Sequence, residues 1–395
     1  MNSLRQLFLK YVAQTSETPL LLEVEKAEGV YLFGPGGRKY FDLISGVSVS
    51  NVGHCHPRVV KAISEQSSQY MHLMVYGEYV QYPQVRLAEK LSSLLPSKLN
   101  NIYFVNSGSE AVEGAIKLAK RFTGRTEVVS FKNAYHGSTH GALSLMGDEE
   151  QKRSFRPLLP DIRQITFNSF EDIELITNRT ACVILEPIQG EAGIVLPDVN
   201  YLKKIRERCS EVNALLIFDE IQTGLGRTGT LFAFEQFKVI PDILLLAKAL
   251  GGGLPLGAFI SSKEVMNCLT HDPALGHITT FGGNPVCCAA ALAALDVLLE
   301  EKLIGQVKKK EQIFRKYLAK HKQVKEIRSS GLFMAVELAS SELVQKLIHV
   351  SLSKGVVLDW FLFCSSAFRI APPLSITEDE CIKASEIILE SMDSL

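Results

Sequence analysis

The sequence predicts an α/β fold in which a mostly parallel sheet is covered by helices on both faces. Short apolar segments alternate with helix-length segments through the middle of the 395-residue chain. Strands that are apolar throughout are typical of a sheet buried on both faces, and helix-length connections favour parallel order. The apolar segments occupy residues 101–105, 126–131, 181–185, 214–218 and 242–246.

The first of these strands leads into the clearest helix of the chain. Residues 109–122 have helical spacing, and Gly124 suits the left-handed position that ends many helices. Ser107 and Glu110 have the spacing of a capping box. The free N–H groups at such a helix start attract phosphate, although a plain helix cap explains the same residues.

The two ends of the chain predict a second, smaller domain. A long charged helix at 303–321 precedes short strands near 331–338 and 368–374. The N-terminal part has an amphipathic helix near residues 4–12 and a hairpin over 29–43. The expected divisions are an N-terminal segment that joins the small domain (1–45), a large domain (46–298) and a C-terminal small α+β domain (299–395).

The composition excludes some classes of partner. Lys and Arg together number 42 against 43 Asp and Glu, so no net charge attracts nucleic acid or an anionic membrane. No uncharged apolar stretch is long enough to cross a bilayer. The 8 cysteines lack the dense spacing of a secreted disulfide framework, and the first residues do not resemble a signal peptide. We therefore expect a cytoplasmic protein whose partners are small molecules or other protein chains.

Ionisable side chains follow the last three of these strands. Glu186 follows the third strand, Asp219 and Glu220 follow the fourth, and Lys248 comes soon after the fifth. Because the carboxyl ends of parallel strands meet at one edge of a sheet, we expect these side chains to lie close together. A buried carboxylate is costly unless a cation meets it. The pattern therefore predicts a charged site at this edge.

Lys248 is the most informative of these residues. A lysine in an apolar environment has a lowered pKa and can condense with a carbonyl group, although a surface lysine is the simpler interpretation of the residue alone. Pyridoxal phosphate needs such a lysine, a helix start for its phosphate and a carboxylate for its pyridine nitrogen. Lys248, the helix start at Ser107–Ser109 and Asp219 supply all three.

A second cluster, His54-Cys55-His56, raises the question of a metal site. Pro57 instead favours the first position of a helix, and no further ligands are evident in the sequence. We therefore expect no bound metal.

The chain resembles the class III aminotransferases, in the subgroup that holds acetylornithine, ornithine and 4-aminobutyrate aminotransferases. The resemblance covers nearly the whole chain and depends on motifs that occur in the family's order. These motifs are "NSGSEAVEGAIKLAK", "YHGST", "EPIQGEAG", "FDEIQTGLGRTG", "AKALGGGLPLGA" and "TTFGGNP".

This resemblance implies a fold type I transferase with a seven-stranded sheet, assembled as a homodimer with active sites at the interface. Lys248 would carry the cofactor covalently, Asp219 would pair with its pyridine nitrogen, and Gln222 would reach its phenolic oxygen. The other cofactor residues would be Gly108 and Ser109 at the phosphate, Tyr135 stacked on the ring, His136 and Glu186 beside it, and Thr280 from the partner subunit.

The resemblance also implies a substrate site. Glu191 and Arg369 match a pair in which the arginine binds a substrate carboxylate or turns to the glutamate, although a structural salt bridge would use the same residues. Ser138 stands where ornithine-type members usually have arginine, and Val47 where ornithine-specific members have tyrosine. We expect a ping-pong transfer from an ω-amino donor, acetylornithine- or ornithine-like, to 2-oxoglutarate. The alternatives are a 4-aminobutyrate- or diamine-type transaminase with pyruvate as acceptor, a decarboxylase, a racemase or an aminomutase of the same family.

Overall fold

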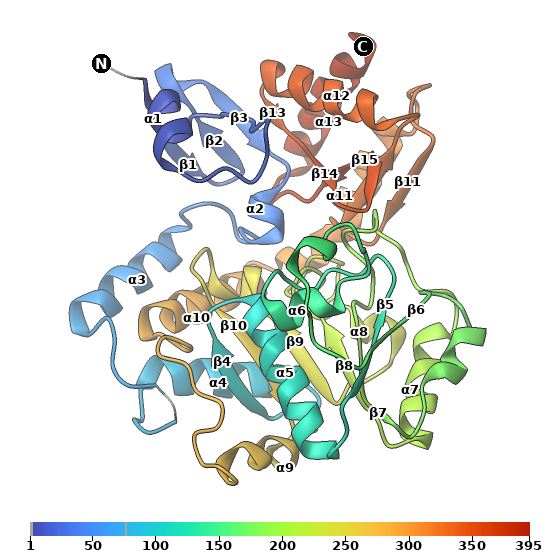
Figure 1. Cartoon of the computed structure of the whole chain (residues 1–395). Helices are drawn as coiled ribbons and strands as arrows, with labels where there is room; N and C mark the ends of the chain where they lie inside the picture. The colour runs from blue at the N-terminus through green and yellow to red at the C-terminus, as the bar shows by residue number, and fades with distance from the viewer. Residues whose placement is uncertain (1–2, 76) are drawn as a thin grey trace.

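A seven-stranded sheet lies at the centre of the larger part of the molecule, in a computed structural model that describes residues 3–75 and 77–395. Its strands lie in the order β4-β10-β9-β8-β7-β5-β6 (Figure 1). All neighbours are parallel except β10, which runs antiparallel to both β4 and β9. The bounds are β4 Asn101–Val105, β5 Glu127–Phe131, β6 Ile162–Ile165, β7 Thr180–Leu185, β8 Leu215–Asp219, β9 Ile243–Leu246 and β10 Gly257–Ser261. The expected α/β fold with a mostly parallel sheet is confirmed.

Helices cover both faces of this sheet, because successive side chains of each strand enter opposite cores. In β8, Leu215 and Ile217 pack with the helix α5, whereas Leu216 and Phe218 belong to the core on the other face. That second core includes side chains of α4, α7 and α10. The helices are α3 Pro57–Gln69, α4 Tyr82–Leu94, α5 Gly108–Thr123, α7 Tyr201–Glu211 and α10 Pro285–Glu300, and the shorter ones are α6 His140–Leu145, α8 Phe234–Phe237 and α9 Lys263–Met266.

The predicted helix α5 forms with one correction at its start. Gly124 ends it with a left-handed φ of 68°, as expected. Ser107 Oγ accepts the N–H of Glu110 at 3.2 Å, but the Glu110 carboxylate accepts the N–H of Asn106 at 2.8 Å rather than that of Ser107. The capping box is therefore incomplete, because Glu110 reaches one residue further back than that motif requires.

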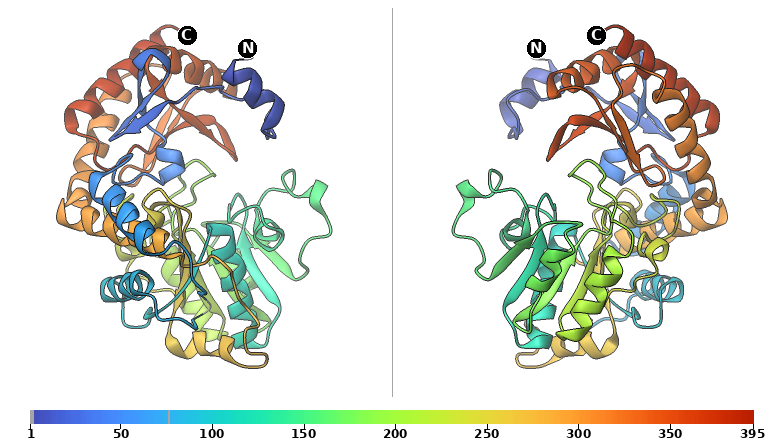
Figure 2. Two further views of the ribbon diagram at one scale, coloured as in Figure 1. Left: turned by 90° about the vertical axis from the view of Figure 1, so that its left-hand side faces the viewer. Right: turned by 90° about the vertical axis from the view of Figure 1, so that its right-hand side faces the viewer.

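Both ends of the chain build the smaller part of the molecule, where Figures 1 and 2 show them together above the large sheet. One four-stranded sheet contains β1, β2 and β3 with β13, which pairs in parallel with β3; the other has the order β11-β12-β15-β14. This pairing joins the N-terminal segment to the C-terminal part, while the exact domain boundaries stay a prediction. The strands are β1 Lys26–Glu28, β2 Tyr31–Phe33, β3 Lys39–Asp42, β11 Glu326–Ser329, β12 Met334–Glu337, β13 Val356–Val357, β14 Asp359–Phe361 and β15 Cys364–Ile370. The helices are α1 Leu4–Tyr11, α11 Leu303–Leu318, α12 Ser341–Lys354 and α13 Glu378–Asp393.

The strand expected over 368–374 is displaced in the structure. It ends at Ile370 and begins earlier, at Cys364. Pro372 and Pro373 have no N–H group to donate to a neighbouring strand, so the strand does not extend through them. None of the helices in the described part of the chain is both long and apolar enough to span a membrane.

A short segment between the two parts has an unusual backbone. Residues Ser45–Ser48 (α2) all have positive φ values, between 54° and 64°. Such a left-handed turn is costly for L-residues and persists only when its surroundings hold it. Here the Asp42 carboxylate accepts the N–H groups of Ile44 and Ser45, and Ser45 Oγ donates to the carbonyl of Ala371 at 2.7 Å. The turn is thereby fixed to the residue that follows β15.

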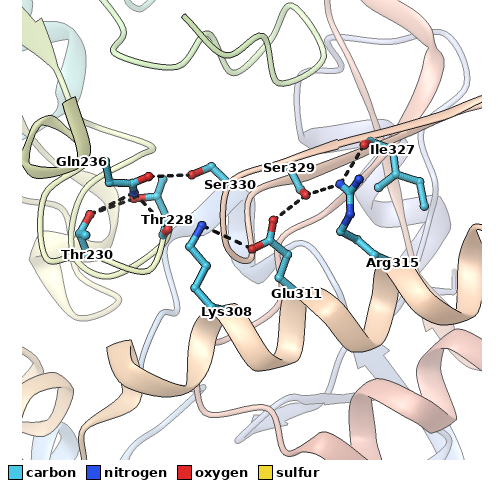
Figure 3. Close-up of polar contacts among 9 residues, drawn as sticks. All are labelled: Thr228, Thr230, Gln236, Lys308, Glu311, Arg315, Ile327, Ser329 and Ser330. Atoms are coloured by element: carbon cyan, nitrogen blue, oxygen red, sulfur yellow. Dashed lines mark hydrogen bonds and ion pairs between the residues drawn. The ribbon is translucent and has the colours of Figure 1, made fainter. Parts of the chain in front are cut away.

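Two groups of polar contacts meet at the end of β11: one joins Ser330 to the segment after β8, and the other joins Ser329 to α11 (Figure 3). Gln236 donates to the Thr228 hydroxyl at 2.8 Å and accepts the hydroxyl of Ser330 at 3.4 Å. On the other side, the Glu311 carboxylate accepts the hydroxyl of Ser329 at 2.6 Å, and Arg315 donates to that same hydroxyl at 2.7 Å. The loop is thus fastened to the smaller part by side chains.

Candidate active site

A cavity of about 350 Å³ lies where β7, β8 and β9 end beside the start of α5. It brings together most of the residues that the sequence analysis assigned to a cofactor. Those that line it are Gly108, Ser109, Tyr135, His136, Glu186, Asp219, Gln222 and Lys248. Of the charged site expected at the carboxyl edge of the sheet, Glu186, Asp219 and Lys248 share this pocket, whereas Glu220 is buried and does not line it.

Asp219 closes β8 and is 3% exposed. One carboxylate oxygen pairs with His136 Nδ1 at 2.7 Å, and the other accepts the N–H of Ile221 at 3.0 Å. Burial works against a charge on His136, but the hydrogen bond and the charge of Asp219 outweigh it and raise the pKa of that imidazole. Within this chain, the side chain that meets Asp219 is therefore the His136 imidazole, whose cationic form the carboxylate favours.

Glu186 and Glu220 are buried carboxylates that accept backbone N–H groups. Burial raises the pKa of each to about 7. Glu186 accepts the N–H groups of Tyr135 at 3.2 Å and Gly190 at 2.8 Å. Glu220 accepts two backbone N–H groups at 2.6 and 2.7 Å, thirteen and fourteen residues further along the chain. Both side chains therefore hold loops in place around the pocket.

Lys248 follows β9 and begins a short 3₁₀ turn, with a left-handed φ of 50°. Desolvation in the pocket lowers the pKa of its amine to about 8, although the charges of Glu191, Asp219 and Glu186 oppose that shift. A lysine with this pKa has about a tenth of its amines neutral at pH 7, far more than an ordinary lysine. The structure thus gives Lys248 the environment that a carbonyl-condensing amine needs.

The start of α5 forms the anion-binding end of the pocket. Gly108 and Ser109 are the first residues of this 16-residue helix, so their N–H groups have no partner within it. Gly137 packs against the helix start with a φ of 122°, and a Cβ there would lie 2.1 Å from Ser109 Oγ. Only glycine therefore allows the "YHG" turn to approach this closely.

Tyr135 and Ser138 lie at the edge of the pocket. Tyr135 lines the cavity, and its hydroxyl is 3.2 Å from the Ser138 hydroxyl. The N–H of Ser138 donates to Ser109 Oγ at 3.3 Å. Ser138 itself is exposed and is not among the lining residues. A longer side chain at position 138 would therefore start beside the pocket rather than inside it.

Glu191 and Arg369 form a buried ion pair next to the cavity. Arg369 Nη2 lies 2.7 and 2.8 Å from the two carboxylate oxygens, and Arg369 is 1% exposed. Gln222, which lines the cavity, donates to Glu191 at 3.1 Å. Burial alone would raise the pKa of Glu191, but the Arg369 charge and hydrogen bonds lower it. The pair therefore carries both charges at neutral pH.

This ion pair leaves buried polar atoms without partners. Arg369 Nε and Nη1, together with Gln222 Oε1, have no hydrogen-bond partner among the described residues. The guanidinium also lies 4.6 Å from the centre of the Phe361 ring. Unpaired buried donors cost free energy, so a further oxygen ligand at Arg369 would be favourable.

Thr280, His54 and His56 lie outside the pocket. Thr280 is exposed and does not line the pocket within one chain. His54 pairs with Asp42 at 2.7 Å, whereas His56 caps α3 and pairs with Glu301 at 3.2 Å. The two histidines thus have separate partners. Across residues 3–75 and 77–395, no three His, Cys, Asp or Glu side chains form a metal-binding group.

Some residues around the pocket were not singled out by the sequence analysis. Mostly apolar residues complete the cavity wall. Arg227, in the "GLGRTG" part of a motif, is fully buried but does not line the cavity. Loops have no hydrophobic periodicity, so the sequence could not predict that Arg227 is buried. Only its place in the motif marked it. The missed lining residues are Val49, Asn106, Gly137, Ile221, Ala247, Gly253, Leu254, Pro255 and Leu256.

The residues present fit pyridoxal phosphate. A helix start with free N–H groups suits its phosphate, a buried carboxylate suits its ring nitrogen, and a desolvated lysine suits its aldehyde. Gln222, whose Oε1 has no partner among the described residues, lines the same cavity. The pocket therefore presents each kind of contact that the cofactor requires.

Comparisons with known proteins agree with this chemistry. A family model for class III aminotransferases matches residues 11–392. The acetylornithine aminotransferase of Methanopyrus kandleri is 40% identical over 383 residues, which cover 96% of this chain and 96% of the relative. That of Clostridium acetobutylicum is 39% identical over 380 residues, which cover 93% and 95%.

Solved structures support the same relationship. The ornithine aminotransferase of Toxoplasma gondii matches with a TM-score of 0.91 at 31% identity, covering 98% of this chain and 94% of that one. A second structure of that enzyme is described with partial occupancy of pyridoxal phosphate at its active site. The chain therefore belongs to the class III aminotransferases, a family of transaminases that depend on pyridoxal phosphate.

Proposed function

We propose that this enzyme transfers an amino group from an ω-amino donor, acetylornithine- or ornithine-like, to 2-oxoglutarate in a ping-pong reaction. The observation that carries the proposal is the buried Glu191–Arg369 pair, whose guanidinium has unpartnered donors. The amino donor and then the 2-oxo acid must bind in one pocket, and only the 2-oxo acid brings a carboxylate to Arg369. An arginine with an internal alternative partner suits that requirement.

The chain's own residues supply the acid–base chemistry. When bound, pyridoxal phosphate supplies an electron-withdrawing ring that stabilises negative charge on the substrate carbon. Lys248, whose pKa lies near 8, would take a proton from that carbon on its amine and deliver it to C4′ of the cofactor. Asp219, held in place by His136, would pair with the pyridine nitrogen of the bound cofactor. The start of α5 anchors the phosphate and so fixes the position of the reacting atoms.

Arg369 serves the two substrates differently. While an ω-amino end occupies the pocket, Arg369 stays paired with Glu191 and its charge is neutralised. A 2-oxo acid offers a carboxylate, which pairs with Arg369 and displaces Glu191. A charge-assisted pair of this kind contributes roughly 1.5–3 kcal/mol.

The donor itself is suggested by relatives and limited by Ser138. The curated relatives named above are acetylornithine aminotransferases, and the Toxoplasma gondii neighbour is an ornithine aminotransferase. Ser138 cannot provide the bidentate contact that arginine gives to a distal carboxylate. We therefore expect an ω-amino donor that does not need an arginine at this position, such as an acylated diamino acid held by other residues, or a diamine or 4-aminobutyrate-type compound.

The proposal includes a cytoplasmic homodimer in which Thr280 completes the partner's phosphate site. The segment around Thr280 borders a second cavity of about 660 Å³ on the surface. Leu275, Ile278 and Phe281 are exposed beside it, a pattern that favours burial against a second copy. Thr280→Ala is expected to weaken cofactor retention, measured by dialysis of the loaded enzyme. A fully active monomer at low concentration would contradict the shared site.

A panel of amino donors tests the proposal directly. Each donor is incubated with 2-oxoglutarate or with pyruvate, and both glutamate or alanine and the carbonyl product are measured. Glutamate formation with an ω-amino donor, and parallel lines in double-reciprocal plots, are expected. Amino-acid racemisation or decarboxylation without glutamate would support a different class III reaction instead.

A further inference from the structure

Arg227 is a buried arginine that pairs with no carboxylate in the described part of the chain. It is 0% exposed, and none of the ion pairs among the described residues includes it. Its guanidinium donates instead to neutral oxygens. Burying a cation in this way is costly, so the position of Arg227 requires an explanation beyond ordinary packing.

The oxygens that Arg227 contacts come from separate parts of the chain. Nη1 donates to the carbonyl of Leu332 at 2.9 Å and to that of Pro372 at 2.6 Å. Nη2 donates to the side-chain oxygen of Asn51 at 2.5 Å. The N–H of Leu332 returns a hydrogen bond to the Arg227 carbonyl at 3.0 Å. Only a planar fork with several donors can meet acceptors in these different directions.

Two of these contacts lie at one end of the strand pair β12–β15, and β15 carries Arg369. Leu332 lies just before β12, and Pro372 lies just after β15. β12 and β15 are paired, with Ala335 directly opposite Arg369. Arg227 therefore holds the two strands together at the end nearest to Arg369.

The backbone of Arg227 belongs to the loop that contains Gln222. That loop begins directly after Asp219, and Gln222 contacts Glu191 from it. Asn51 strengthens the connection, because its side chain donates to the Leu225 carbonyl at 2.8 Å and its carbonyl accepts the N–H of Leu374 at 2.7 Å. The contacts of Figure 3 include the next residue, Thr228, and join the same loop through Gln236 to Ser330, two residues before Leu332.

We propose that Arg227 is a positioning residue for substrate carboxylates: it fixes the strand of Arg369 to the loop of Gln222, so that Arg369 can exchange Glu191 for a substrate without the strand moving. The inference rests on the proposed function of Arg369. Arg227 touches neither the cofactor site nor the substrate, and it acts through the carbonyl groups at the ends of β12 and β15.

Lys310 provides a matched control. It is also a buried cation, 2% exposed, and it donates to a carbonyl of the same segment, that of Leu374, at 2.7 Å. Lys310 comes from α11, however, and makes no contact with the Gln222 loop among the described hydrogen bonds. Replacing it removes a comparable buried contact without separating that loop from β15.

The test compares Arg227→Lys, Lys310→Met and Arg369→Gln as cofactor-loaded enzymes. We measure KM and kcat for 2-oxoglutarate, the single-turnover rate with the amino donor, and the affinity of the unreactive dicarboxylate glutarate by calorimetry. For Arg227→Lys we expect KM and the glutarate dissociation constant to rise about tenfold, with the donor rate within about threefold of the wild type. Lys310→Met is expected to leave both carboxylate constants within about twofold.

The outcomes separate this inference from the proposed function. If Arg369→Gln leaves glutarate binding unchanged, the carboxylate site is wrong and the inference fails with it. If Arg369→Gln weakens glutarate binding but Arg227→Lys changes it no more than Lys310→Met does, the site stands and only the role of Arg227 is overturned. Should Arg227→Lys fail to fold, Asn51→Ala removes the Nη2 acceptor and the Leu225 contact, and the same tenfold rise is expected there.

Discussion

The two sides of the pocket are built differently. On the cofactor side, each oxygen of Asp219 and Glu186 has a partner, either a backbone N–H group or His136. On the substrate side, the Arg369 guanidinium keeps two buried nitrogen atoms without partners among the described residues, whereas on the cofactor side such atoms are His136 Nε2 and Gln222 Oε1. The first side lies at the carboxyl ends of one sheet, whereas the second joins a loop of that sheet to β15 of another.

This difference indicates which side is fixed and which is exchangeable. Carboxylates held by a fixed donor on each oxygen resist displacement and still have room for a further contact, and a cofactor that stays bound through many turnovers benefits from such a rigid site. A site that must accept alternating substrates needs a contact that can be replaced at little cost. Arg369, with two unpartnered nitrogen atoms, meets that need. Substitutions on the first side should therefore abolish chemistry, and substitutions on the second should change selectivity.

The largest effect is expected from Lys248→Ala. Proton transfer by a positioned amine contributes about 10²–10⁴-fold by itself, and the covalent attachment of the cofactor is lost as well. Transaminase activity should fall by at least that factor. Borohydride reduction of the wild-type enzyme should attach the cofactor to the peptide that contains Lys248. Attachment to a different lysine would contradict the assignment.

Asp219→Asn also tests the cofactor side, with a smaller expected loss of activity. Removing one preorganised charge from an active site typically lowers kcat by about 10²–10³-fold, and we expect a loss of that size with the cofactor still bound. Spectroscopic titration measures cofactor binding, and steady-state kinetics measures kcat. Near-normal turnover would mean that the carboxylate does not act on the pyridine nitrogen.

The cofactor side was also the more predictable from sequence. Its residues follow apolar strands or open a helix, and those patterns are visible without any tertiary information. The strands β6 and β10 were missed, since Ile162–Ile165 has mixed polarity and Gly257–Ser261 follows a glycine-rich stretch. These omissions did not affect the site, because the strand ends that form it were identified.

Contacts between distant segments were harder to predict. The sequence indicated that Asp219 needs a cation but could not pair it with His136, which precedes it by more than eighty residues. The loop-fastening role of Glu220 and the buried position of Arg227 likewise depend on chain segments that meet only in the folded molecule. Local patterns thus identified the charged residues, while tertiary contacts determine their partners.

On the substrate side, Glu191→Gln should change selectivity. It removes the charge that competes for Arg369 but keeps one oxygen acceptor, so a carboxylate substrate meets a less neutralised guanidinium. We expect the ratio of kcat/KM for 2-oxoglutarate to that for the ω-amino donor to rise about tenfold, or about 1.4 kcal/mol. Equal losses for both substrates would indicate a static salt bridge.

Ser138→Arg should shift donor choice by a smaller amount. Ser138 lies beside Tyr135 at the edge of the pocket, where an arginine could reach a distal carboxylate. Activity toward N-acetylornithine or ornithine should rise several-fold relative to the natural donor, measured in the same donor panel. If the unmodified enzyme already uses N-acetylornithine best, the argument from Ser138 is wrong, while membership of the family is unaffected.

The smallest effect concerns the pH at which Lys248 loses its proton. This pH connects the cofactor side with the substrate side, because Glu191 and Arg369 both act on the pKa of Lys248. Burial holds the pKa of this amine near 8, the charge of Glu191 raises it, and the charge of Arg369 lowers it. In the cofactor-free protein, the rate of acetylation of Lys248 by acetic anhydride should therefore increase with pH and reach half its maximum near pH 8, followed by mass spectrometry of the peptide. Because only the neutral amine reacts, Glu191→Gln should move this midpoint to lower pH and Arg369→Gln to higher pH. A midpoint near 10.5 that neither variant moves would show that Lys248 is solvated and electrostatically independent of the substrate side.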